Sequence, residues 1–480
     1  MATIPVVLEE RASDALFVSC AGATRTFKQE RDEAERLAGA LYARGVRKGE
    51  RVATILPNCI EHVDLIFACA RLGAIHVPVN VFLKGDFLRY QLDDCSPAVV
   101  VADDAGLDAL REIGREGIRP DDLDGGDATP AIVEPADVMS IIYTSGTTGM
   151  PKGCMLPFGY HIQQDNSLLD YRPGDVLYTA LPLFHGWARG MLFAALNHGL
   201  AMHIDADFSA TSALQRIRET KATVFSGVGA MGMAMLAQQP RDDDGSNDLR
   251  VAFMIPFSAD AEKTFTARFG PRVQSQMYGQ TETGAITFTP LAERGKPGTI
   301  GKPSPTYDVR LADDGEVLVR EKRPDTMFKG YWPSADRPEW HHTGDLARVD
   351  DDGYFVFVDR KKDALRRRGE NISSVQLEAA IASHEQITEA AVVAVEAELT
   401  EDEIKACIVT TGPIDPSDLF TFFRERLPYF AIPRYVEIVD ALPKTATMRV
   451  QKHVLRSAGV TTATWDFEAL GLTVARDERR

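Results

Sequence analysis

Residues 143–153 read Tyr-Thr-Ser-Gly-Thr-Thr-Gly-Met-Pro-Lys-Gly, and two apolar residues, Ile141 and Ile142, lead directly into them. Glycine lets the backbone turn its N–H groups inward, and these groups can surround phosphate oxygens together with serine and threonine hydroxyls. Lys152 would add a positive point charge for the same anion. The GxxxxGK[ST] spacing of a P-loop is absent. The stretch predicts an anion-binding loop, with a polar surface turn as the alternative.

The composition is that of a globular protein with an acidic balance. The 480 residues are 44% hydrophobic and 26% charged, and a chain of this length has room for two or three domains. The net charge of −17 argues against nucleic acid as a partner, because phosphate backbones need clustered cations. The basic run at 366–368 is still compatible with a small anionic ligand.

The cysteines indicate a reducing compartment, and we expect a cytoplasmic protein. They form no CxxC pair and have no histidine at metal-ligand spacing, so we expect free, mostly buried thiols. No apolar run approaches about 18 residues and the N-terminus carries no basic segment, so neither a membrane span nor an export signal is expected. The cysteines are Cys20, Cys59, Cys69, Cys95, Cys154 and Cys407.

Between residues 26 and 255 the chain alternates helical and strand patterns. Thr26 and Gln29 can form a capping box for a helix over 26–45. Strands separated by helices predict a mainly parallel sheet with both faces covered. The expected strands are 51–56, 75–79, 98–102, 176–181, 222–226 and 250–255, and the further helices are 60–72, 84–92 and 211–219.

From about residue 297 the pattern becomes β-rich, with strands expected at 307–311, 316–320 and 354–358. Beyond Arg360 the chain turns basic and then returns to a βα pattern. This shift predicts an α/β protein with a large N-terminal domain over 1–360, made of αβ layers with a β-rich subdomain. A small α+β C-terminal domain over 361–480 would follow.

Four stretches in register resemble one family. They are the loop at 143–153, Gln-Met-Tyr-Gly-Gln-Thr-Glu at 276–282, Trp-His-His-Thr-Gly-Asp at 340–345 with Asp-Arg-Lys-Lys-Asp at 359–363, and Arg-Gly-Glu-Asn-Ile-Ser at 368–373. Their order and separations resemble the adenylate-forming (AMP-forming) acyl-CoA synthetases, with their luciferase and peptide-synthetase relatives. Residues 367–374 look closest to the carnitine/crotonobetaine–CoA ligase-like branch. The resemblance implies that the C-terminal domain is a mobile lid, with ATP between it and the N-terminal domain.

The resemblance also implies roles for individual residues. Tyr278, beside Gly279, would stack on adenine, Thr281 would contact the α-phosphate, and Glu282 would bind Mg²⁺, for which a hard carboxylate is suitable. Asp345 would accept the ribose hydroxyls with support from Arg360. The phosphates would be held by Thr144, Ser145, Gly146, Thr147, Thr148, Gly149 and Lys152.

These assignments have structural alternatives. Tyr278 would otherwise be a core aromatic, Glu282 a carboxylate near a helix N-terminus, and Asp345 a turn residue after Gly344.

Three further positions match the family. Lys362 corresponds to the hinge of the lid, with a solvated charge as the alternative. Gly369 corresponds to the wall of the tunnel that holds the pantetheine of CoA. His185 corresponds to a histidine near the acyl pocket, with a structural histidine as the alternative.

The sequence departs from the family at two informative places. The family signature Pro-Lys-Thr-x-x-Gly-Lys ends in a catalytic lysine, but Arg449 stands at this position and Lys452 lies three residues further on. Arginine keeps the charge but is a longer, planar group. Met254 stands where relatives have a small residue, so we expect a narrowed acyl pocket that excludes long chains.

Three functions are compatible with these residues. The first is an ATP-dependent ligase that adenylates a small or aromatic carboxylic acid and transfers it to CoA. The second is a diazotase-type relative that activates nitrous acid for attack by an aromatic amine without CoA. The third is a catalytically silent binding protein, against which the retained Lys152, Glu282, Asp345 and Arg360 count. We expect a monomer or a homodimer that binds neither nucleic acid nor membrane.

The replacement of the signature lysine gives a first prediction. Arg449→Lys should preserve or raise carboxylate-dependent adenylation, because it restores the compact ammonium of the family. The measurement is pyrophosphate release with the acid substrate. A collapse of activity would instead give Arg449 a dedicated role and favour the diazotase chemistry.

Overall fold

The computed structural model describes residues 3–126, 128–144, 151–162, 168–361, 365–367, 370–395, 403–427, 429, 431–445 and 449–474. The chain divides into two compact units. The first comprises residues 1–310, 318–341 and 350–355, and the second comprises residues 311–317, 342–349 and 356–480. The predicted domain boundary at residue 360 stays a prediction.

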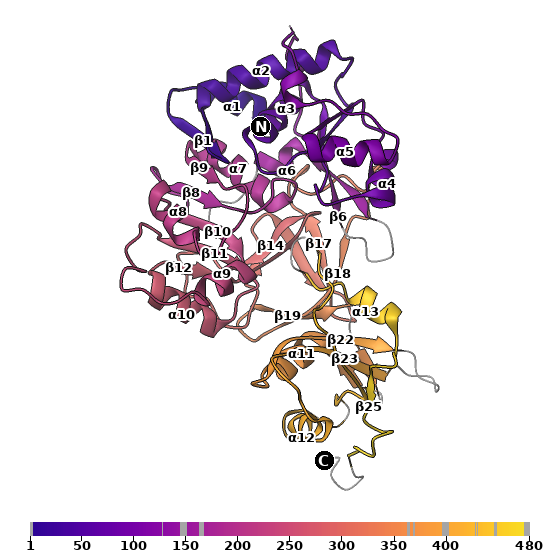
Figure 1. Cartoon of the computed structure of the whole chain (residues 1–480). Coiled ribbons are helices and arrows are strands. Elements are labelled where there is room, and N and C mark those ends of the chain that lie inside the picture. The colour runs from indigo at the N-terminus through magenta and orange to yellow at the C-terminus, as the bar shows by residue number, and fades with distance from the viewer. Residues whose placement is uncertain are drawn as a thin grey trace. The chain divides into compact units, whose positions relative to one another are not determined.

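The first unit contains a mainly parallel five-stranded sheet (Figure 1). In spatial order its strands are β5 (Val99–Ala102), β3 (Arg51–Ile55), β4 (Ile75–Pro78), β6 (Val138–Thr144) and β7 (Lys152–Pro157). The first four strands are parallel, and β7 returns antiparallel to β6. The three strands predicted before residue 103 are confirmed.

A second, seven-stranded sheet belongs to the same unit. Its spatial order is β12 (Arg272–Gln274), β11 (Val251–Ile255), β10 (Val224–Val228), β8 (Val176–Thr179), β9 (Ala201–Ile204), β1 (Leu16–Cys20) and β2 (Ala23–Thr26). Neighbouring strands are parallel except for the antiparallel pair β1–β2. The strands predicted at 176–181, 222–226 and 250–255 are confirmed.

Helices cover both sheets. The apolar contacts place α4 (Gly85–Cys95) and α5 (Asp104–Glu112) on one face of the five-stranded sheet. On its other face lie α2 (Phe27–Ala43) and α3 (Ile60–Leu72). The seven-stranded sheet packs against α1 (Ile4–Arg11), α3, α6 (Phe158–Ile162) and α7 (Gly186–His198) on one side, and against α8 (Ala213–Thr220), α9 (Gly229–Leu236) and α10 (Ala259–Phe269) on the other. A short 3₁₀ turn, η1, spans Pro120–Asp122.

Local sequence rules explain where α2 begins. The Thr26 hydroxyl accepts a hydrogen bond from the Gln29 backbone, and the Gln29 side chain accepts one from the Thr26 backbone. The capping box that the sequence predicts is therefore confirmed, and it satisfies two N–H groups that a helix start otherwise leaves unpaired.

The later part of the chain is β-rich, as predicted. One small sheet contains β13 (Met277–Gln280), β14 (Gly284–Phe288) and β15 (Lys302–Pro303), and another contains β16 (Tyr307–Leu311), β17 (Glu316–Glu321), β18 (His341–Val349) and β19 (Phe355–Arg360). A two-stranded ribbon follows, with β20 (Leu365–Arg367) and β21 (Glu370–Ile372).

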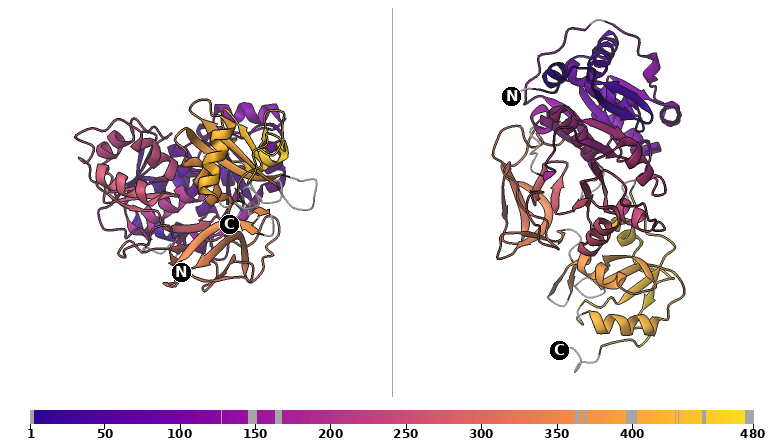
Figure 2. Two further views of the ribbon diagram at one scale, coloured as in Figure 1. Left: turned by 90° about the horizontal axis from the view of Figure 1, so that it is seen from below. Right: turned by 90° about the vertical axis from the view of Figure 1, so that its left-hand side faces the viewer.

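The second unit ends in a four-stranded sheet drawn in orange and yellow (Figure 2). Its strands are β22 (Ile387–Val395), β23 (Glu403–Thr410), β24 (Tyr435–Ile438) and β25 (Trp465–Asp466). Apolar contacts place α11 (Ser374–Ala382) and α12 (Pro416–Arg426) on one face, and α13 (Lys452–Ala458) on the other. The unit therefore has its own hydrophobic core.

The cysteines are free thiols, and all except the half-buried Cys59 are buried. Burial raises the pKa of Cys69 to about 12, which makes its thiol unreactive at neutral pH. In the part of the chain that the structure describes, no helix is both long enough and apolar enough to cross a bilayer.

A buried polar chain crosses the first unit. Arg189 is fully buried and its Nη1 lies 2.7 Å from His76 Nδ1. His76 Nε2 lies 3.0 Å from Thr54 Oγ1, which lies 3.4 Å from His62 Nε2. His62 Nδ1 lies 3.1 Å from the Pro57 carbonyl oxygen.

The two residues at the ends of this hydrogen-bonded series, Arg189 and Pro57, determine how its protons are arranged. Arg189 only donates, so His76 Nδ1 accepts and His76 Nε2 carries the proton that goes to Thr54. The Pro57 carbonyl only accepts, so His62 Nδ1 carries a proton and His62 Nε2 accepts from the Thr54 hydroxyl. His76 must therefore be neutral in the folded protein, and a neutral His62 completes the same network.

Burial supports the same protonation state. It lowers the pKa of His62 from 6.5 to about 4, and the charge of Arg189 acts in the same direction. The unfolded chain consequently binds more protons than the folded chain between pH 6.5 and pH 4. The contribution of His62 to the free energy of unfolding is fully present above pH 6.5. It falls by about 3 kcal/mol as the pH decreases from 6.5 to 4.

His62→Asn tests this linkage. The variant should be less stable at pH 7 by about 1–2 kcal/mol, because a buried hydrogen bond is disturbed. At pH 4 it should equal or exceed the wild type, since it no longer titrates. Urea unfolding at both pH values measures the change, with the exposed His453→Gln as the control. Parallel stability curves for His62→Asn and wild type would contradict the assignment.

Candidate active site

The predicted anion-binding stretch lies at the carboxyl end of β6, an inner strand of a parallel sheet. Ligands of open α/β sheets bind outside such strand ends. Thr144 is the last residue of β6 and is paired with Lys152, the first residue of β7. Ser145, Gly146, Thr147, Thr148 and Gly149 lie outside the described residues, so their predicted roles stay predictions.

β7 is paired along both of its edges. On the edge away from β6, the Gly153 and Met155 carbonyls accept from the Trp332 and Lys329 amides at 2.8 Å each. A side chain at Gly153 would lie 2.7 Å from an Ile141 methyl group. Glycine at this position therefore allows a close approach, and the pairing fixes residues 329–332 beside Lys152.

Tyr331 consequently connects two predicted site residues. Its ring lies 5.3 Å from Lys152 Nζ, and its hydroxyl donates to Glu282 Oε1 at 2.8 Å. Burial raises the pKa of Tyr331, and the Glu282 charge acts in the same direction, so the phenol remains a donor. Lys152 is exposed, whereas the Glu282 carboxylate is nearly buried.

The turn between β13 and β14 carries the adenine and magnesium candidates. Tyr278 and Gly279 lie on β13, and Thr281 and Glu282 lie in the turn. A side chain at Gly279 would overlap the Gly284 carbonyl, which explains the glycine. Tyr278 is half-buried, and Glu282 does not lie near a helix N-terminus, so that alternative for Glu282 is wrong.

The donor set around Glu282 suits a metal that is shared with phosphate. Mg²⁺ is commonly held by one or two carboxylates together with substrate phosphates and water. Within the described ranges no cluster of three or more His, Cys, Asp or Glu side chains could hold a metal by itself. A single carboxylate, orientated by the Tyr331 hydroxyl, fits the shared arrangement.

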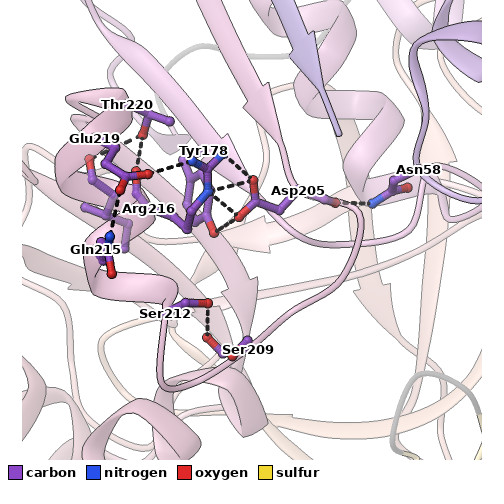
Figure 3. Close-up of polar contacts among 10 residues, drawn as sticks. Asn58, Tyr178, Asp205, Ser209, Ser212, Gln215, Arg216, Glu219 and Thr220 are labelled. Atoms are coloured by element: carbon purple, nitrogen blue, oxygen red, sulfur yellow. Dashed lines mark hydrogen bonds and ion pairs between the residues drawn. The ribbon is translucent and has the colours of Figure 1, made fainter. Parts of the chain in front are cut away.

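The loop that carries His185 is held in place by Asn58. The Asn58 amide donates to the Leu181 and Asp205 carbonyls at 3.1 and 2.9 Å and accepts from the Leu183 backbone at 2.8 Å. Figure 3 shows Asn58 beside Asp205, whose carboxylate accepts from Tyr178 and Arg216.

His185 itself is the residue immediately before α7 and is half-buried. Its predicted place near an acyl pocket stays a prediction.

An aromatic pair lies between α7 and the seven-stranded sheet. Trp187 stacks on Phe253 of β11 with ring centroids 4.2 Å apart, and its indole donates to Ser226 Oγ at 2.6 Å. Met254 points to the opposite face of β11, where it packs in the core under α9 and α10. Side chains alternate along a strand, so Met254 and Phe253 face opposite ways. The expectation that Met254 narrows the acyl pocket stays a prediction.

In the second unit, Asp345 and Arg360 form an ion pair. Asp345 is buried on β18, and its Oδ1 lies 3.7 Å from Nε of Arg360, the last residue of β19. Gly344 has a φ of +69°, a conformation that favours glycine, and the Asp345 amide donates to Thr343 Oγ1 at 3.2 Å. Asp345 is thus a residue within a strand, preceded by a left-handed glycine.

Lys452 is linked to this pair through hydrogen bonds. The Arg360 amide donates to the buried Asp359 carboxylate at 2.7 Å, and the Ser374 hydroxyl donates to the same carboxylate at 3.1 Å. Lys452 Nζ donates to Ser374 Oγ at 2.5 Å and lies 2.8 Å from Glu378 Oε1. Lys452 is therefore engaged inside the second unit.

Arg449 is exposed, and its backbone pairs with Thr445. Whether Arg449 or Lys452 performs the role of the family lysine stays a prediction. Lys362 and Gly369 lie outside the described residues, so the hinge and the tunnel wall also stay predictions.

Sequence reasoning did not find Tyr331, Trp187 or Phe253. Tyr331 lies about 180 residues from Lys152 along the chain, and the signal available was the Gly-Tyr-Trp sequence at 330–332. Trp187 follows the predicted His185 by two residues, and Phe253 adjoins the singled-out Met254. Only the strand register shows that Phe253 and Trp187 share a face.

Comparisons with known proteins identify the family. Residues 8–332 match the AMP-binding enzyme family, and residues 376–449 match the AMP-binding enzyme C-terminal domain. The crotonobetaine/carnitine–CoA ligase of Salmonella arizonae is 30% identical, over 92% of this chain and 95% of the relative.

Two solved structures have similar folds. The o-succinylbenzoate coenzyme A synthetase of Bacillus subtilis, in complex with ATP and magnesium, is 27% identical with a TM-score of 0.83, covering 94% of this chain and 98% of that structure. An anthranilate CoA ligase in complex with anthranoyl-AMP is 25% identical with a TM-score of 0.85, covering 96% and 97%.

The chain therefore belongs to the AMP-binding enzyme family, in its acyl-CoA ligase group. The predicted family, the α/β fold with a smaller C-terminal part, and the prediction of an enzyme are confirmed. The relatives and solved structures compared are coenzyme A ligases, and they give the diazotase alternative no support.

Tyr331→Phe tests the connection between Lys152 and Glu282. The variant keeps the ring under Lys152 but leaves the nearly buried Glu282 carboxylate without its phenolic donor, which should lower the free energy of unfolding by about 1–2 kcal/mol. Denaturant unfolding measures the loss. The control is the exposed Tyr42→Phe, and an equal, negligible effect of both variants would show that the Tyr331 bond is not made.

Proposed function

We propose that the protein is an ATP-dependent, AMP-forming ligase that activates a small aromatic carboxylic acid and transfers it to CoA. The observation that carries the proposal is the Lys152–Tyr331–Glu282 arrangement. It places an ammonium and a carboxylate on one tyrosine, beside the end of β6 where the anion-binding sequence begins. Nucleotide phosphates with Mg²⁺ need both charge types next to each other.

The reaction follows from these charges. A carboxylate oxygen of the acid attacks the α-phosphorus of ATP, and the bond to the bridging oxygen breaks to release pyrophosphate. Lys152 and Thr281 would stabilise the negative charge that grows on the phosphates, and Glu282 would hold Mg²⁺, which spreads the same charge when bound. Asp345 and Arg360 would hold the ribose. The thiol of CoA then attacks the acyl carbonyl and AMP leaves.

The Trp187–Phe253 pair supports an aromatic acid. Trp187 is partly exposed, and the buried Phe253 ring and the Ser226 hydroxyl fix its orientation, so its ring would offer an aromatic contact to the acid. Flat rings favour offset or edge contacts with another aromatic ring. The anthranilate CoA ligase similarity agrees with an acid of this size.

The second substrate is CoA by analogy with the relatives. Their names describe transfer to CoA, and the match covers nearly the whole length of both chains. We propose, as before, a cytoplasmic monomer or homodimer whose remaining partners are small molecules.

The test is pyrophosphate release from Mg–ATP with a panel of small aliphatic and aromatic acids, with and without CoA, and in a separate arm with nitrite and an aminophenolic acid. Release with aromatic acids, together with AMP and an acyl-CoA product, is the expected result. Release only with nitrite and an aminophenolic acid, indifferent to CoA, would overturn the proposal. Absence of release in every arm would also overturn it.

Two substitutions test the nucleotide site. Lys152→Ala and Glu282→Ala should each reduce ATP-dependent pyrophosphate release about 100-fold or more, the scale of losing one charge-stabilising group. The matched controls are Lys263→Ala and Glu219→Ala, which alter exposed charges on α10 and α8. Near-normal rates in both site variants would remove the assignment.

A further inference from the structure

Glu316 is a buried carboxylate that receives hydrogen bonds from three residues on two segments of the second unit. Its Oε1 accepts from the Gly344 amide at 3.0 Å, and its Oε2 accepts from His342 Nδ1 at 3.0 Å and Lys361 Nζ at 2.9 Å. The residue is 4% exposed. A carboxylate removed from water in this way must be strongly bound by its donors.

Two of these donors adjoin the Asp345–Arg360 pair. Gly344 immediately precedes Asp345, and Lys361 immediately follows Arg360. The Lys361 amide also donates to the Gly344 carbonyl at 2.8 Å. The carboxylate therefore connects the backbone beside Asp345 to the side chain beside Arg360.

The hydrogen bond from the Gly344 amide to Glu316 restrains a glycine, the residue type with the greatest backbone freedom. Gly344 has a positive φ, and a side chain built there would meet no neighbour within 4 Å. Packing therefore does not hold Gly344, so hydrogen bonds must hold it. β18 and β19 are hydrogen-bonded neighbours in the sheet, but the Asp345–Arg360 contact of 3.7 Å is too long to be a hydrogen bond that fixes these two side chains.

The charge of Glu316 is maintained by the same contacts. Burial alone raises the pKa of its carboxyl, but the hydrogen bonds from His342, Lys361 and Gly344 outweigh burial, and the pKa lies below its usual value. Lys361 is also 2.7 Å from the Asp314 carboxylate, which is half exposed. Asp314 is thus the outer partner of this lysine and Glu316 the inner one.

We propose that Glu316 is a positioning residue for the Asp345–Arg360 pair, and so for the ribose of ATP. The inference rests on the proposed function, which assigns that pair to the ribose. Glu316 does not touch the nucleotide. It fixes the residues on either side of the two that would, and its loss should weaken ATP binding without changing the binding of the acid.

The experiment compares Glu316→Gln with Glu321→Gln in acid-dependent pyrophosphate release. Glu321 lies on the same strand, β17. Its partly buried carboxylate accepts from the Thr326 and Met327 amides at 3.1 Å each and pairs with Arg337, so it is a hydrogen-bonded control carboxylate without the Gly344 and Lys361 contacts. Glu316→Gln should raise KM for ATP about tenfold, as expected for one lost charge-assisted contact, and change KM for the acid less than about twofold. Glu321→Gln should change neither.

Asp345→Asn separates the two proposals. If it leaves KM for ATP unchanged, the ribose assignment in the proposed function fails. If Asp345→Asn raises KM for ATP but a well-folded Glu316→Gln does not, the positioning role of Glu316 is overturned while the proposed function stands. Equal rises in the two KM values of Glu316→Gln would indicate general damage and also overturn the positioning role.

Lys361→Met covers the case in which Glu316→Gln does not fold. Lys361 is half exposed, so its substitution leaves the core intact. It should raise KM for ATP about threefold, a smaller change because the Gly344 contact remains. An unchanged KM for ATP in Lys361→Met would then count against the inference, and Asp314→Asn, which removes only the outer partner, serves as its control.

Discussion

The backbone pairing of β7 is the constraint on which the first unit's candidate site depends. This strand is bonded to β6 on one edge and to residues 329–332 on the other. Buried amides must find partners, so the two ladders leave the register of all three segments fixed. This register, together with the Phe328 amide that donates to the Glu282 carbonyl at 2.9 Å, places Tyr331 between a lysine at the start of β7 and a carboxylate in the β13–β14 turn. The three residues are far apart along the chain.

The fold was largely predictable because its signals are local. A capping box marks the start of α2, and alternating helical and apolar patterns predicted six of the eleven strands that the structure describes before residue 256. The strands β1, β2, β6, β7 and β9 were not predicted. The motif residues were predicted because they lie close together in short, characteristic stretches of sequence. Tyr331 and Glu316 were not predicted, because each acts through contacts with residues that are distant in the sequence and become neighbours only in the folded structure.

The side chain at Met254 illustrates a related point. Position in a motif does not tell which face of a strand a side chain occupies, and a shift of one residue exchanges the two faces. Phe253, not Met254, faces Trp187. A substrate argument from sequence therefore needs the register as well as the residue type. The paired Asp345 and Arg360, by contrast, lie on adjacent elements as their motifs indicate.

The proton order between Arg189 and Pro57 has a consequence for how this protein can change. Each group in the chain has its donor or acceptor role imposed by its neighbour, so a substitution at one position alters what is acceptable at the next. The effects of replacing Thr54 and His76 should not add, because the two share one hydrogen-bond network. These positions form an epistatic set: homologues that lack one of them are expected to have exchanged several together, and a designer repacking this interior would have to redesign them as a group.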